Sequence, residues 1–198
     1  MRKFLVALWL VFLFSVIGVL FWYNEWVYHL PTPIPENYKP VDQGRLIRLN
    51  GIAEAGHSKP VFLHFFNPDC PCSRFNMANF KSLVKRYGRQ VNFVIVVMNN
   101  KLYTAKAIQD KFDLDLPVLF DPSIAASCGV YSTPQAVLLD EDHKLYYRGN
   151  YNSSRYCTDE KTNYARIAIT GLLHDHQKII FNQLALRAYG CQLPNCTK

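Results

Sequence analysis

The chain has 198 residues, of which 49% are hydrophobic and 19% are charged, and its formal net charge is +7. A chain of this length holds one domain, or at most two. The basic residues are scattered and form no stripe, which argues against nucleic acid as a partner. Their excess instead suits a surface that faces an anionic membrane.

The N-terminal segment predicts a membrane anchor. As a helix rising about 1.5 Å per residue, the apolar run from Phe4 to Trp22 spans roughly 28 Å, close to the thickness of a hydrocarbon core. Basic residues precede the run and none follows it before Lys39, an asymmetry that keeps the N-terminus in the cytoplasm. We therefore expect a cytoplasmic tail over residues 1–3 and an uncleaved transmembrane signal-anchor over residues 4–23. A cleaved signal peptide is the alternative, but no A-x-A-like cleavage site follows the run.

The anchor is expected to lead into a spacer and one domain. Prolines are concentrated between residues 31 and 40, which predicts a stiff, proline-rich spacer over residues 24–45. Residues 46–198 are enough for one hydrophobic core, and we expect them to form a single domain with a C-terminal extension. The orientation of the anchor attaches this domain to the inner (cytoplasmic) membrane and places it in the periplasm or another extracytoplasmic space.

Short apolar runs and helical periodicity alternate through the domain. Strands are expected at Pro60–Phe66, Val91–Met98 and Pro117–Phe120, followed by a hairpin that joins Gln135–Leu139 to Lys144–Arg148. Helices are expected at Ser73–Tyr87, Tyr103–Phe112, Pro122–Cys128, Thr162–His174 and Lys178–Ala188. This order predicts an α/β fold in which helices flank a central mixed sheet.

The most informative motif is Cys70-Pro71-Cys72, between the first strand and the first helix. Proline is favoured at the first helical position, which makes Cys70 the N-cap of the helix. The positive end of the helix dipole and the free backbone N–H groups at that position favour a thiolate over a thiol. We therefore expect Cys70 to be the reactive nucleophile and Cys72 to be its resolving partner.

The spacing of the two cysteines leaves three interpretations open. Side chains two positions apart on a helix point about 160° apart, so a Cys70–Cys72 disulfide needs the extended backbone of an N-cap and retains some strain. Strained, accessible disulfides tend to be oxidising and catalytic. The two cysteines are alternatively partners in separate structural bridges, or soft thiolate ligands for Cu(I).

The strand Val61–Phe66 leading into the C-P-C motif, and Gly129–Pro134 directly before a later strand, resemble the thioredoxin superfamily over residues 46–175. The resemblance implies a thioredoxin-like fold in which Pro134 is a cis-proline facing the redox cysteines. It also implies that Thr133 offers backbone groups to an extended substrate. The superfamily usually has C-x-x-C, whereas this chain has one residue fewer between the sulfurs. A C-P-C pair also serves redox chemistry in the Mia-type oxidoreductases, which have a different fold.

Two further likenesses refine this expectation. The stretches Cys70–Phe75 (CPCSRF) and Tyr151–Cys157 (YNSSRYC) resemble a bacterial redoxin-like family of unknown function, whose members are typically membrane-anchored in Gram-negative bacteria. The activating threonine of peroxiredoxins is absent, which argues against peroxidase activity. Sco-type copper chaperones add a histidine from a late hairpin to their cysteines, so a copper site of Cys70, Cys72 and His143 stays open.

Four more cysteines lie downstream of the motif. An even number permits full pairing in an oxidising compartment, but the sequence does not give the connectivity. Cys128 ends an apolar helical turn and is expected to be a small buried thiol. We hypothesise a structural Cys157–Cys191 disulfide that clamps the tail to the domain. A Cys191–Cys196 link competes with it, and Cys157 or Cys191 could instead relay electrons to Cys70.

Together these residues predict a membrane-anchored thiol–disulfide oxidoreductase that uses a C-P-C redox pair. Such an enzyme exchanges with protein thiols and disulfides and needs no bound cofactor or metal. The first alternative is a copper-binding or metallochaperone module of the same fold. The second is a non-catalytic adaptor whose thioredoxin-like groove only binds partners.

Overall fold

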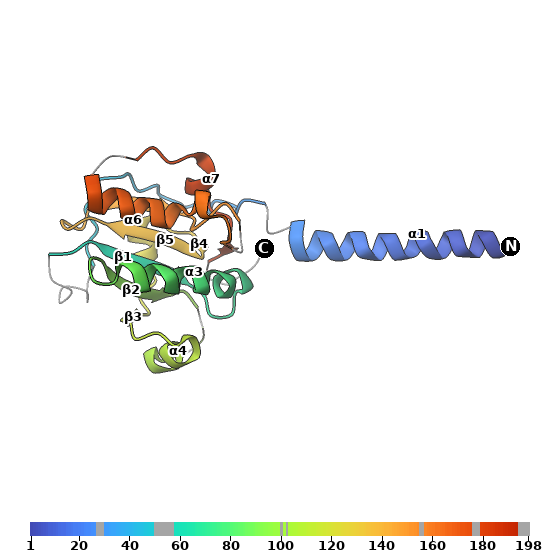
Figure 1. The fold of residues 1–198 in the computed structure, drawn as a ribbon, viewed down its shortest axis with the longest axis horizontal. Helices are drawn as coiled ribbons and strands as arrows, with labels where there is room; N and C mark the ends of the chain where they lie inside the picture. The colour runs from blue at the N-terminus through green and yellow to red at the C-terminus, as the bar shows by residue number, and fades with distance from the viewer. Residues whose placement is uncertain are drawn as a thin grey trace.

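The computed structural model describes residues 1–26, 30–49, 58–99, 101, 103–154, 157–175 and 179–193. Its N-terminal helix α1 (Arg2–Phe21) continues into a π-helical turn, η1 (Trp22–Trp26), and projects away from the rest of the molecule (Figure 1). An 18-residue window within the joined helix has a mean hydropathy of 2.8, and the remainder of the chain buries none of that window. Within the described residues it is the one helix that is long and apolar enough to cross a membrane.

A mixed sheet forms the centre of the domain, with the strand order β3-β2-β1-β5-β6. Its strands are β1 (Val61–Phe66), β2 (Asn92–Val97), β3 (Val118–Leu119), β5 (Gln135–Leu139) and β6 (Leu145–Gly149). β1 is parallel to β2 and antiparallel to β5, so it lies in the middle of the sheet with every residue buried. Burial on both faces explains why this strand is almost continuously apolar and does not alternate with polar residues.

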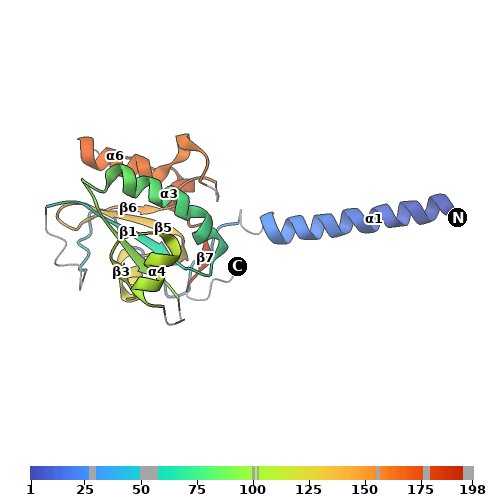
Figure 2. The same ribbon diagram turned by 60° about the horizontal axis from the view of Figure 1, so that its bottom comes forward.

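Helices cover both faces of this sheet. They are α3 (Pro71–Tyr87), α4 (Ala105–Phe112), α5 (Ser123–Cys128) and α6 (Tyr164–Asp175), and a 3₁₀ turn, η2 (Glu160–Thr162), precedes α6. α3 and α6 lie together on one side of the sheet (Figure 2), where Phe62 packs in their core. α5 covers the other side, where Leu63 packs. Phe62 and Leu63 reach different cores because successive strand side chains point to opposite faces.

The predicted strands and helices as far as α6 are confirmed, each close to its expected ends. The helix predicted over Lys178–Ala188 is wrong in length, because only α7 (Gln183–Leu186) is helical, and Lys178 lies outside the described residues. Asn150 Nδ2 donates hydrogen bonds to the carbonyl oxygens of Leu184 and Arg187 at 2.7 and 2.6 Å. These side-chain contacts occupy carbonyl groups that a longer helix would use for its own ladder.

A second, smaller sheet has no counterpart in the predicted elements. β4 (Ser132–Thr133) pairs antiparallel with β7 (Cys191–Gln192), near the end of the described chain. Strands of two residues show no periodicity, so hydrophobic patterning does not reveal them. The pairing returns the C-terminal segment to the edge of the domain at which α3 begins.

The stretch predicted to be a spacer lies along the domain from residue 30 onward. Gly44 N donates to the carbonyl oxygen of Leu145 at 2.8 Å, and Tyr38 Oη donates to the carbonyl oxygen of Gly129 at 3.0 Å. Thr32 is buried, with 3% of its surface exposed. These residues therefore contribute contacts to the fold, and the domain boundary at residue 45 stays a prediction.

A buried histidine lies in the core between β1 and α3. His64 lies on β1 with its Nδ1 2.6 Å from Tyr151 Oη, and its ring stacks on Phe80 with centroids 4.1 Å apart. Complete burial lowers the pKa of His64 from 6.5 to about 3, because the imidazolium would lose its hydration there. At neutral pH the folded protein therefore holds this imidazole uncharged.

This histidine predicts a loss of stability in mild acid. The unfolded chain protonates His64 near pH 6.5, and the folded chain does so only near pH 3. The neutral ring therefore makes its full contribution to the free energy of unfolding above the unfolded pKa. As the pH falls from the unfolded pKa toward the folded pKa, this contribution is lost by about 1.4 kcal/mol per pH unit. Urea unfolding from pH 6 to pH 4.5 is expected to show this slope in the wild type and a shallower one in His64→Phe. An equal slope in both proteins contradicts the assignment, and His174→Gln, at an exposed histidine, is the matched control.

Candidate functional site

The first cysteine of the motif stands at the start of α3. Cys70 is the N-cap of this helix, with extended backbone angles of φ −81° and ψ 124°, and Pro71 occupies the first helical turn. The carbonyl oxygen of Cys70 accepts a hydrogen bond from Arg74 N at 3.2 Å. The predicted N-cap position is confirmed. The sulfur makes no capping hydrogen bond, because it is covalently bonded elsewhere.

A hydrogen-bonded loop fixes the chain just before this N-cap. Asn67 Oδ1 accepts from Asp69 N at 3.0 Å and from Asn99 Nδ2 at 2.8 Å. The Asp69 carboxylate pairs with Lys101 Nζ at 2.9 Å and accepts from Tyr103 Oη at 2.8 Å. The Lys101 contact is the main reason that the pKa of Asp69 falls to about 2, and the Tyr103 hydrogen bond adds to it. Pairing with a cation also offsets a negative charge that stands one residue before the cysteine.

The sulfur of Cys70 forms a disulfide with Cys191, which lies 121 residues further along the chain. Cys72 completes the cluster, since the three sulfur atoms all lie within 4.8 Å of one another. All three residues are buried, with exposed fractions of 0% for Cys70, 3% for Cys72 and 2% for Cys191. The N-terminus of α3 therefore carries a compact centre of three cysteines, which we call the sulfur cluster.

The hypothesised Cys157–Cys191 disulfide is wrong. The tail delivers Cys191 to Cys70, whereas Cys157 Sγ donates a hydrogen bond to Asn76 Oδ1 at 2.9 Å. The competing Cys191–Cys196 link is not formed either, and Cys196 itself lies outside the described residues. Nothing in the cysteine spacing signals the observed pairing, because connectivity depends on a non-local contact that spacing does not encode.

The strand pair β4–β7 brings the tail to the sulfur cluster. Thr133 stands opposite Cys191, and Ser132 stands opposite Gln192. The next peptide bond, between Thr133 and Pro134, is cis, which is the geometry that the resemblance to the thioredoxin superfamily implied. The cis-proline segment and the sulfur cluster are thus neighbours, joined through Cys191.

Thr32 ties a third segment into this arrangement. Its Oγ1 donates to the carbonyl oxygen of Gly190 at 2.8 Å, accepts from Gly190 N at 2.9 Å, and lies 3.0 Å from Ser132 Oγ. Ser132 Oγ in turn donates to the carbonyl oxygen of Cys191 at 3.2 Å. A Cβ at Gly190 would collide with the carbonyl oxygen of Thr133, so only glycine permits this close approach. The contact joins the N-terminal stretch, β4 and the tail at one point.

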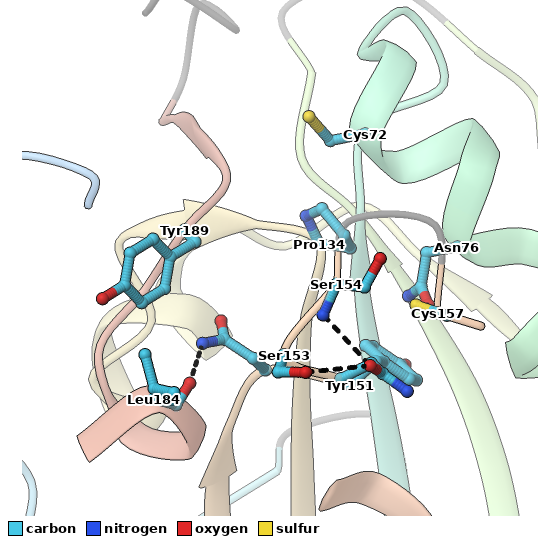
Figure 3. Close-up of a pocket in the computed structure, with 11 residues that line it drawn as sticks. Cys72, Asn76, Pro134, Tyr151, Ser153, Ser154, Cys157, Leu184 and Tyr189 are labelled. Carbon is cyan, nitrogen blue, oxygen red and sulfur yellow. Dashed lines mark hydrogen bonds between the residues drawn. The ribbon is translucent and has the colours of Figure 1, made fainter. Parts of the chain in front are cut away.

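A pocket opens beside the sulfur cluster (Figure 3). Its volume is about 180 Å³, and its lining includes Cys72, Pro134, Asn76, Cys157 and Tyr189. The lining residues are formally uncharged, and most of the remaining ones are asparagine, serine or tyrosine. Such a surface can accept the backbone or an uncharged polar side chain of a peptide, and it reaches the cluster on the side of the second cysteine.

The family of the chain follows from a comparison of sequences. The family model described as Domain of unknown function (DUF6436) matches residues 43–193. The chain belongs to this family. Among curated proteins, none matches the chain.

Solved structures place the DUF6436 domain in a known fold. A hypothetical protein from Sinorhizobium meliloti 1021 is 19% identical with a TM-score of 0.64, and the match covers 80% of this chain and 97% of that one. An uncharacterized conserved protein from Geobacillus kaustophilus is 18% identical with a TM-score of 0.57, over 77% and 93% of the two chains. A thiol:disulfide interchange protein of the thioredoxin family from Chlorobium tepidum TLS is 16% identical with a TM-score of 0.50, over 68% and 99%. The predicted thioredoxin-like fold is confirmed.

The structure separates His143 of the DUF6436 domain from the sulfur cluster. β5 runs antiparallel to β1 with Leu139 opposite Val61, so the hairpin that holds His143 lies beyond the start of β1. Cys70 follows the other end of that strand, roughly 16 Å away at about 3.3 Å per residue. The alternative copper site of Cys70, Cys72 and His143 therefore lacks its third ligand.

Two cysteines of the DUF6436 domain lie outside the sulfur cluster. Burial raises the pKa of Cys128 to about 12, and it raises the pKa of Cys157 to about 12 as well. Cys128 is fully buried under the sheet, which confirms its prediction as a small buried thiol. A thiol with such a pKa is a poor nucleophile at neutral pH, because the thiolate is the reactive form.

The raised pKa values predict that these two cysteines resist alkylation in the folded protein. In the folded, reduced protein at pH 7, Cys128 and Cys157 are expected to resist iodoacetamide, since a pKa near 12 leaves a thiolate fraction of about 10⁻⁵. Both are expected to react readily once the protein is unfolded in urea. Pulse labelling followed by peptide mass spectrometry measures the two rates. Fast labelling of Cys157 in the folded protein contradicts the assignment.

Proposed function

We propose that this DUF6436 chain is a membrane-anchored, extracytoplasmic thiol–disulfide oxidoreductase with Cys70 as its nucleophile. The observation that carries the proposal is the meeting of three cysteine sulfurs within 4.8 Å, at the N-terminus of a helix and next to a cis-proline segment. The thioredoxin-like fold supports the same chemistry, since one protein with this fold carries the name thiol:disulfide interchange protein.

The position of Cys70 supports its role as the attacking thiolate. Once the disulfide is reduced, the sulfur stands at the N-cap of α3, where backbone N–H groups have no helical partner. The positive end of the dipole of this long helix also favours negative charge there. The thiolate then attacks one sulfur of a client disulfide, the client disulfide breaks, and its other sulfur leaves as a thiolate.

Cys72 supplies the second step. Its sulfur lies within 4.8 Å of the Cys70 sulfur, so a small movement brings it into bonding distance. Attack of the Cys72 thiolate on Cys70 Sγ forms a Cys70–Cys72 disulfide and releases the client thiolate. Run in reverse, the same steps oxidise a client dithiol. Electrons come from thiols in both directions, so the reaction needs no bound cofactor.

The surroundings of the cluster support protein clients as substrates. Thr133 and Pro134 lie on the edge segment next to Cys191, and in the proposed function they receive an extended client segment through backbone groups. The uncharged pocket beside Cys72 suits an adjacent polar portion of the client. In the proposed topology, α1 lies in the inner membrane and the domain faces the periplasm.

The nucleophile assignment predicts a sharp mutational contrast. The probe is a fluorescent cysteine peptide joined by a disulfide to glutathione, and the reduced full-length protein is expected to release glutathione from it. Cys70→Ser is expected to reduce this release to the background rate, because the remaining thiols lack the N-cap position. Cys128→Ala removes a buried cysteine and is expected to match the wild type. Equal release by Cys70→Ser and the wild type would overturn the proposal and favour a partner-binding adaptor.

A second function is favoured by one observation, the three-sulfur geometry itself. In the reduced protein, Cys70, Cys72 and Cys191 offer three buried thiolate ligands, a set that suits a soft ion such as Cu(I). In this alternative, Cys191 takes the place that the sequence left open for His143. A copper module is expected to retain one Cu(I) per chain against a bicinchoninate competitor and to lose it in Cys191→Ser. If the wild type readily loses copper to bicinchoninate, the copper-module alternative is excluded.

A further inference from the structure

The most reactive cysteine of the proposed site is also the least accessible. Cys70 has 0% of its surface exposed, and its disulfide partner Cys191 has 2%. A protein client has to bring its own sulfur into line with Cys70 Sγ, and no client can do so in this arrangement. The described structure is therefore a closed form of the site, and catalysis by Cys70 requires the cover to move.

The cover is the C-terminal segment of the same chain. Cys191 forms a disulfide with Cys70 and simultaneously stands opposite Thr133 in the β4–β7 pair. Leu193 N extends this contact with a hydrogen bond to the carbonyl oxygen of Tyr131 at 3.3 Å. The tail thus has the two properties required of a client: a cysteine bonded to the nucleophile and an extended backbone paired beside the cis-proline.

We propose that Cys191 is a third redox-active cysteine, carried by a tail that occupies the client position and is released when Cys72 takes its place on Cys70. This inference rests on the proposed function and adds to it a closed state and the residue that opens it. The client class follows from the occupant: an extended segment that presents a cysteine and pairs in antiparallel fashion with Thr133.

The release step balances without any external reagent. The Cys72 thiolate attacks Cys70 Sγ, a Cys70–Cys72 bond forms, the Cys70–Cys191 bond breaks, and Cys191 leaves as a thiolate. The three cysteines of the sulfur cluster share one disulfide before and after, so the step is an isomerisation at constant oxidation state. The proximity of all three sulfurs supports both directions of this exchange. A client dithiol then meets the Cys70–Cys72 disulfide and is oxidised as described above.

Few non-covalent contacts bind the tail to the domain, so the tail can be released. It consists of the two residue pairs of β4–β7, the Leu193 contact, and the approach of Gly190 to Thr32 and Thr133. Because a Cβ at Gly190 would strike the Thr133 carbonyl oxygen, Gly190→Ala weakens docking while it keeps every cysteine. Two variants therefore separate the contributions. Cys191→Ser removes the sulfur of the tail, and Gly190→Ala weakens only its non-covalent docking.

The test uses the oxidised full-length protein in lipid nanodiscs and a dithiol peptide that carries a fluorophore and a quencher. Cys191→Ser is expected to oxidise the peptide faster than the wild type, by about tenfold if about a tenth of wild-type molecules are open. Gly190→Ala is also expected to oxidise the peptide faster than the wild type. Cys72→Ser is expected to retain the Cys70–Cys191 disulfide and to leave the peptide reduced. Cys128→Ala is the matched cysteine control and is expected to follow the wild type.

Disulfide mapping after an acid quench gives the second measurement. The wild type is expected to yield both Cys70–Cys191 and Cys70–Cys72 peptides, and Cys72→Ser only the former. Hydrogen exchange in residues 188–193 is expected to be slow in Cys72→Ser and fast in Cys191→Ser.

The outcomes separate this inference from the function on which it rests. If Cys191→Ser and Gly190→Ala oxidise the peptide no faster than the wild type, while Cys70→Ser is inactive, the tail proposal is overturned and the oxidoreductase stands. If neither the wild type nor Cys191→Ser oxidises the peptide, the proposed function itself falls. Should Cys191→Ser fail to fold, Gly190→Ala and the disulfide map decide the question.

Discussion

The antiparallel pairing of Thr133 with Cys191 is the contact around which the site is arranged. It brings together a helix N-terminus, a cis-proline segment and the end of the chain, although Cys70 and Cys191 are separated by 121 residues. The disulfide alone would tether the tail without orienting it. The strand pair supplies the orientation, since backbone hydrogen bonding fixes which side chain faces the neighbouring segment.

Environment, more than residue type, distinguishes the cysteines of this chain. Cys70 lies where a helix presents unpaired N–H groups, and the carboxylate of the preceding residue, Asp69, contacts Lys101 and Tyr103. Cys128 and Cys157 lie where burial disfavours the charged form and raises the pKa of each thiol to about 12. In the proposed function, the same functional group therefore reacts at Cys70, whereas burial keeps it inert at Cys128 and Cys157.

Local signals carried most of what could be predicted. The apolar run of β1, the proline after Cys70 and the helical spacing of α3 each depend on neighbouring residues, and all three led to the correct elements. The pairing of the tail could not be predicted, because β7 and its partner β4 each have only two residues. Pairing over such a distance leaves no trace in periodicity, so the sequence favours Cys157, which follows a loop rich in tyrosine, asparagine and serine, over Cys70 as the partner of Cys191.

Side-chain competition accounts for the other departures. Asn150 takes the carbonyl oxygens of Leu184 and Arg187 and so limits α7 to a single turn within an otherwise helix-compatible stretch. In the proline-rich stretch, Thr32 finds backbone partners on Gly190. Composition predicts stiffness for such a stretch, but it does not predict which surface the stretch adheres to.

In the proposed topology, the contacts of Thr32 limit how far the sulfur cluster can lie from the bilayer. The apolar helix ends at Trp26, and six chain steps at no more than about 3.6 Å each reach only about 22 Å. In the proposed topology, the cysteines are therefore confined to a shallow layer above the lipid headgroups. A loop of a neighbouring integral protein enters that layer easily, whereas a disulfide deep in the middle of a bulky soluble protein does not.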